Sequence, residues 1–173
     1  AAIATAVKEG GQRIIQFAFR KCTFDEDSFN SLKSIYESDE NPTSLCFLNY
    51  NCFSFSNYDT AVRDLVATSP GLFHIGIDDI TAREDETLAT AVMQGLTSTS
   101  SNVRLLNMPL LSPVHVQTLA QCLPKYRSVQ GVNVSFHEES DGQTSSLVRS
   151  AFDRNSSVVI ARVNGLLPED AAY

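Results

Sequence analysis

The 173-residue chain has no hydrophobic run near the roughly 18 apolar residues that span a membrane, and it has no signal-peptide pattern. Basic residues are also few, since 13 Lys and Arg stand against 20 Asp and Glu and give a net charge of −7. A negative chain is a poor ligand for nucleic acid and for anionic membranes. We therefore expect no membrane insertion and no nucleic-acid partner.

Cysteine is sparse, and its spacing does not match that of a common class of metal site. The four cysteines include no Cys-x-x-Cys pair, which argues against a zinc site. We interpret Cys22, Cys46, Cys52 and Cys122 as reduced thiols of an intracellular, cytoplasmic protein. Cys46 and Cys52 are expected at exposed positions on either side of a strand.

The familiar catalytic motifs are missing as well. The sequence contains no phosphate-binding loop, no dinucleotide glycine pattern, no nucleophile elbow and no His-Glu-x-x-His. His74 precedes Asp78 and Asp79, and a carboxylate beside an imidazole can orient a base. Residues of a binding surface explain the same pattern more simply. We therefore expect a protein without catalysis, cofactor or metal.

An internal repeat is the main feature that the sequence does have. Six copies carry apolar residues at their first, fourth and sixth positions, and they recur at a mean spacing of about 29 residues, within the range of repeat proteins. The copies begin near residues 14, 45, 72, 103, 129 and 158. Because their fourth and sixth positions stand two apart, a strand would point both to one face.

Segments with helical spacing separate the copies. Their apolar stripes are Phe29, Leu32, Ile35 and Tyr36; Tyr58, Ala61, Val62, Leu65 and Val66; Leu88, Ala91, Val92 and Leu96; Val116, Leu119, Ala120 and Leu123; and Leu147, Val148, Ala151 and Phe152. Expected N-caps are Ser112 before Pro113, Asp27–Ser28 and Asn57. Acidic runs precede several of these helices, where carboxylates complement the helix dipole. One strand and one helix cannot bury their own apolar face, so the units should stack into a common core.

This pattern resembles a leucine-rich repeat domain of the ribonuclease-inhibitor type. Cys22 stands at the ninth position, where that family uses Asn or Cys, whereas Phe53, Ile80, Leu111, His137 and Leu166 occupy it elsewhere. The resemblance implies an α/β fold, a curved right-handed solenoid of about six repeats with a parallel sheet on the concave side and helices on the convex side. It covers residues 1–173 as a single domain, and we expect both ends to be truncated.

The resemblance also implies protein–protein recognition through the concave face and the loop rim. Phe47 and Leu105 are apolar residues expected on an open sheet, where they need a cover. Asn49, Asn107 and Asn133 are expected in one column, with adjacent strands about 5 Å apart. The candidate partner-binding residues are Phe47, Asn49, Asn51, His74, Asp78, Leu105, Asn107, Asn133 and Arg162.

Other functions remain open at this point. The chain is a candidate structural subunit, or part of a larger chain or complex, whose ends are capped by other chains. Similar repeats occur in Ran GTPase-activating proteins, for which Arg83 in a strand–helix loop is the residue to consider, and in F-box substrate receptors. A doubly wound nucleotide-binding fold is disfavoured because a glycine-rich first turn is missing.

Overall fold

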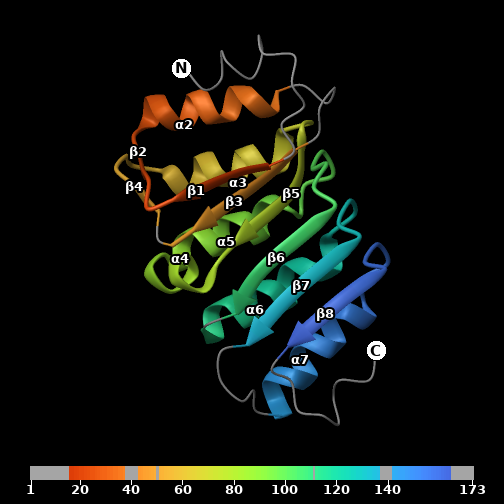
Figure 1. The fold of residues 1–173 in the computed structure, drawn as a ribbon. Helices are drawn as coiled ribbons and strands as arrows, with labels where there is room; N and C mark the ends of the chain where they lie inside the picture. Colours follow the sequence, from red (N-terminus) through yellow and green to blue (C-terminus); the bar gives the residue numbers. More distant parts are fainter. Residues whose placement is uncertain (1–15, 38–42, 50, 111, 137–141, 165–173) are drawn as a thin grey trace.

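The computed structural model describes residues 16–37, 43–49, 51–110, 112–136 and 142–164 of the chain. Six strands form one parallel sheet, in which neighbours in space are also neighbours along the chain (Figure 1). They are β1 (Gln16–Arg20), β3 (Thr43–Leu48), β5 (Leu72–Ile77), β6 (Leu105–Leu110), β7 (Gly131–Phe136) and β8 (Ile160–Asn164). The sheet is not closed, since β1 and β8 lie at opposite ends.

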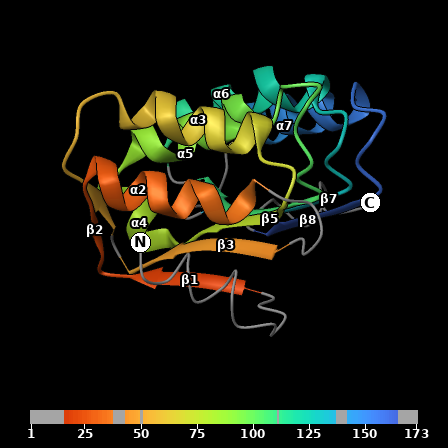
Figure 2. The ribbon, with the colours of Figure 1, turned by 90° about the horizontal axis from the view of Figure 1, so that it is seen from above.

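The helices form a single layer on one face of this sheet (Figure 2). They are α2 (Glu26–Lys33), α3 (Tyr58–Thr68), α4 (Asp79–Glu84), α5 (Glu86–Gly95), α6 (Pro113–Cys122) and α7 (Gly142–Asp153), with 3-10 turns η1 (Ser34–Tyr36) and η2 (Leu123–Lys125). Among the described residues, no helix combines the length and the apolar character needed to cross a membrane. The predicted α/β class, with a parallel sheet and helices, is confirmed.

The helices begin where the sequence supplies caps. Asp25 accepts a hydrogen bond from the Ser28 N–H at 2.8 Å and starts α2, so the predicted cap at residues 27–28 was two to three residues late. Ser112 caps α6 ahead of Pro113, as predicted. Asp85 caps α5 by accepting a hydrogen bond from the Leu88 N–H, and it also accepts one from the Tyr58 hydroxyl at 2.9 Å. Acidic residues therefore cap α2 and α5, whereas a serine caps α6.

The core lies between the sheet and the helix layer. Alternate strand residues point into it, such as Ile75 and Ile77 on β5 and Leu106 and Met108 on β6, and all of them are buried. Of the predicted helical stripes, the residues that the structure buries are Phe29, Leu32, Tyr36, Val62, Leu65, Val66, Leu88, Ala91, Val92, Leu96, Val116, Leu119, Ala120, Leu123, Val148 and Ala151. The helical spacing thus identified the face that packs.

An aromatic cluster fills the end of the core near β1. A second, two-stranded parallel sheet joins β2 (Thr23–Phe24) to β4 (Cys52–Phe53) and places Phe24 over Phe53, with ring centroids 5.4 Å apart. Tyr58 stacks on the other side of Phe53 at 4.9 Å. Such pairs add roughly 0.5–1.5 kcal/mol beyond the area that they bury. The cluster holds the loops after β1 and β3 against α2 and α3.

The register corrects the second repeat copy. Leu45 pairs with Phe17 and Ile75, and Phe47 pairs with Phe19 and Ile77, so Leu45 occupies the fourth position and not the first. The predicted start at residue 45 was therefore three residues late. Phe47, expected on the open face, is fully buried in the core, where its ring lies 6.1 Å from that of Phe24.

Candidate functional site

The face of the sheet opposite the helices is the candidate site, and we call it the open face. The strand register aligns a central column of residues along it: Ala18, Cys46, Gly76, Asn107, Asn133 and Arg162. Cys46 takes the place in this column that was predicted for Asn49. Arg162 lies opposite Asn133 on β8, where the structure describes its backbone.

Two asparagines meet at the middle of the open face. Asn107 and Asn133 are register partners on β6 and β7, and Asn133 Nδ2 donates to Asn107 Oδ1 at 3.1 Å. The predicted proximity of these two residues is confirmed. Because an amide has further donors and acceptors, each side chain can still bond to a partner.

Beside this pair lies a row of exposed apolar side chains. Leu105 and Ile160 flank Gly131 in register, and they are 41% and 63% exposed. A Cβ on Gly131 would lie 2.6 Å from Leu105 Cδ2, which shows that the leucine side chain lies over the glycine. The predicted exposure of Leu105 is confirmed. The row places apolar surface next to the amides of Asn107 and Asn133.

His74 and Cys46 come together at the glycine of the central column. A Cβ on Gly76 would lie 3.1 Å from Cys46 Sγ and 3.7 Å from His74 Nε2. Cys46 is buried, contrary to the predicted exposure, and its sulfur accepts a hydrogen bond from Gln16 Nε2 at 3.2 Å. Burial raises the pKa of the Cys46 thiol and lowers the pKa of His74. Both groups are thereby held neutral near pH 7, which is the opposite of an activated thiolate beside an imidazolium.

Asn51 does not belong to the open face, and this corrects its predicted role. Its side chain is fully buried and spans two loops. Oδ1 accepts from the Cys22 N–H, and Nδ2 donates to the carbonyls of Phe19 and Leu48, all at 3.2 Å. A one-residue extension of the second loop brings Asn51 opposite Cys22, because Phe53 pairs with Phe24. Asn51 therefore stabilises the loops.

Asn49 and Asp78 form a link at the edge of the open face. Asn49 has a left-handed backbone with φ 53°, and its N–H donates to Asp78 Oδ2 at 2.6 Å. Asp78 Oδ1 accepts the Thr81 N–H at 2.9 Å and caps α4. Both residues are half-buried, so they position the loops that border the open face.

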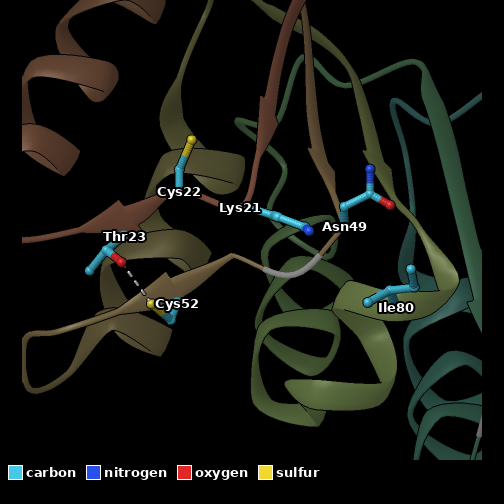
Figure 3. A pocket seen from close by; sticks show the side chains of 6 residues that line it. All are labelled: Lys21, Cys22, Thr23, Asn49, Cys52 and Ile80. Atoms are coloured by element: carbon cyan, nitrogen blue, oxygen red, sulfur yellow. Dashed lines mark hydrogen bonds between the residues drawn. The ribbon is translucent and has the colours of Figure 1, made fainter.

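Two shallow grooves share Ile80 in their lining, and this residue is 50% exposed on α4. The rim groove has a volume of about 570 Å³ and is lined by Lys21, Cys22, Thr23, Asn49, Cys52 and Ile80. Figure 3 shows the Lys21 side chain extending toward the loop of Asn49, while Thr23 and Cys52 share a 3.1 Å hydrogen bond.

The second groove, which we call the Gly76 groove, has a volume of about 490 Å³. Its lining includes Cys46, Gly76, Asp79, Ile80, Asn107 and Pro109. Sequence reasoning missed Ile80, because it was interpreted as the ninth position of a repeat. The acidic pair Asp78–Asp79 is a helix-start signal and would have placed Ile80 on α4.

The chemistry within reach of these grooves favours binding. Within the described ranges, no cluster of three or more His, Cys, Asp or Glu side chains could hold a metal ion. All four cysteines are free thiols. Arg83 lies in the last turn of α4 and not in a strand–helix loop. Leu111, His137 and Leu166, the remaining ninth-position residues, lie outside the described residues.

Comparison of the chain with models of known protein families and with curated proteins finds no match.

Proposed function

We propose that this chain is a curved, right-handed solenoid of the leucine-rich-repeat kind and that it binds a partner protein through its open face, without catalysis. Support for the solenoid comes from the order of the sheet, in which consecutive strands are parallel neighbours. Repetition of a strand and a crossover helix on one face produces such an architecture.

The apolar row on the open face is the observation that carries the binding proposal. Leu105 and Ile160 expose apolar surface beside the hydrogen-bonded amides of Asn107 and Asn133. An apolar centre bordered by polar groups is the usual composition of a protein interface. His74 pairs with Leu105 on the next strand and extends this surface toward Cys46.

The test is an affinity capture from the native source with three forms of the chain. Leu105→Asp changes the apolar row, and Val114→Asp is the matched control, because Val114 is 49% exposed on helix α6. Both variants should fold, with melting temperatures within a few degrees of the parent. We expect the Leu105 variant to retain less than a tenth of the bound partner and the Val114 variant to retain all of it. Equal retention by the two variants would exclude the open face as the binding surface.

A structural role in a larger assembly is the second candidate, and the exposed residues at β8 favour it. Val159, immediately before this edge strand, is 83% exposed, and Ile160 follows it. Another chain could cover this end of the sheet. Loss of the partner on Val159→Asp, with Leu105→Asp unaffected, would favour the structural role.

A further inference from the structure

The Gly76 groove, with a volume of about 490 Å³, has room for one long side chain. Gly76 forms part of its lining, and the neighbouring column residues Cys46 and Asn107 stand on the flanking strands. The Cys46 sulfur and the His74 ring lie 3.1 and 3.7 Å from where a Cβ on Gly76 would stand, so they lie close to the groove at this residue. Pro109 and the exposed Ile80 add apolar lining.

The lining of this groove carries negative charge. Asp78 and Asp79 both line it. The two carboxylate oxygens of Asp78 already accept the N–H groups of Asn49 and Thr81. Asp79 is exposed in the first turn of α4, and the whole chain carries a net charge of −7. A negative potential at both the local and the molecular scale attracts cations.

From this combination we infer that the Gly76 groove accepts an arginine or lysine side chain of a partner protein, an inference that rests on the proposed function. The aliphatic stem of such a residue packs on Ile80 and Pro109, while its charged head reaches Asp79. Asn107 Oδ1 accepts one hydrogen bond, from Asn133, and retains a second lone pair for the incoming donor. The partner therefore presents a basic residue next to the segment that covers Leu105.

The experiment is an NMR titration of the isotope-labelled chain with N-acetyl-arginine amide. N-acetyl-norleucine amide is the uncharged control ligand. Two variants are compared: Asp79→Asn in the groove, and Glu26→Gln, an exposed acidic residue in the first turn of α2. Both variants change the net charge by one unit and alter the same kind of helix position.

We expect the arginine amide to shift the backbone resonances of Gly76, Asp79 and Asn107 at millimolar concentration, and the norleucine amide to leave them in place. Asp79→Asn should weaken the affinity about three- to five-fold, in line with exposed ion pairs, whereas Glu26→Gln should not change it. Equal shifts with both ligands, or equal affinities of the two variants, would overturn the inference. The proposed function would survive that result, because Leu105 lies outside the groove lining and is tested separately.

Discussion

Replacement of Asn51 by alanine is expected to destabilise the fold far more than replacement of an asparagine on the protein surface. The side chain is fully buried and makes three hydrogen bonds of 3.2 Å to backbone groups of the loops after β1 and β3. Alanine can make none of these bonds. The Cys22 N–H therefore loses the Asn51 side chain, which is the only acceptor described for it.

The size of the effect follows from which backbone groups lose their partner. The Leu48 carbonyl also accepts the Lys21 N–H at 3.4 Å, so it remains partly satisfied. The Cys22 N–H loses its described acceptor, and an unsatisfied buried donor costs about 1–3 kcal/mol. With the two weaker losses at the carbonyls, we expect a total decrease of about 2–4 kcal/mol in the free energy of unfolding.

Urea denaturation followed by circular dichroism measures this change. Asn133→Ala is the matched control, since it also removes an asparagine side chain, but one that bonds to Asn107 on the exposed face. We expect the control to lose less than about 1 kcal/mol. A loss for Asn51→Ala no larger than that of the control would refute the loop-stabilising role.

Three further predictions concern the core, a cap and a buried histidine. Phe47→Ala should lower the free energy of unfolding by about 3–5 kcal/mol, because Phe47 is fully buried. Phe73→Ala, at a position that is 41% exposed, should lower it by less than about 1 kcal/mol. Similar losses for the two variants would mean that Phe47 does not point into the core. Asp85→Ala should cost about 1–2 kcal/mol by calorimetry, because α5 loses its cap and Tyr58 its acceptor; no change in melting temperature would contradict this. Burial lowers the pKa of His115 below its ordinary 6.5, so the unfolded chain binds a proton first, and stability should fall as pH drops below 6.5, by at most about 1.4 kcal/mol per pH unit. His115→Leu should reduce that slope in urea titrations, and an unchanged slope would show that His115 does not cause it.

The surroundings of His115 explain why its titration is informative. Both ring nitrogens are buried, and within the described part of the chain neither makes a hydrogen bond of ordinary distance and angle. Glu86 on α5 partly opposes the lowering of the pKa. Burial also lowers the pKa of His74, so the stability of the His115 variant should still decrease somewhat at acid pH.

The periodicity of the sequence predicted the strands and helices well, because burial on one side only leaves a strong pattern. In β6, the buried residues Leu106 and Met108 alternate with the exposed Asn107, and this pattern shows which face of the strand packs on the core. In β3, by contrast, Leu45, Cys46, Phe47 and Leu48 are all apolar, so the sequence alone cannot assign their faces. The register came instead from the pairing of this strand with β1 and β5.

The site was harder to predict than the fold, since side-chain roles depend on contacts between loops. Leu105, Asn107 and Asn133 were placed correctly, as strand alternation alone decides them. Asn51 was misplaced because the second copy was predicted three residues late: β3 ends at Leu48, and Asn51 lies in the following loop, opposite Cys22. Ile80 was missed because the short helix α4 breaks the repeat pattern directly after β5.

The central claim is that the partner lies on the open face, and site-specific photo-crosslinking tests it most directly. The photoreactive residue p-benzoylphenylalanine would replace Asn107 on β6 in one form and Gln117, exposed on α6, in the other. Each form would be irradiated with the captured partner, and the adducts would be measured by mass spectrometry. We predict adducts from position 107 and none from position 117. Adducts from position 117 alone would contradict the account and place the partner on the helix layer.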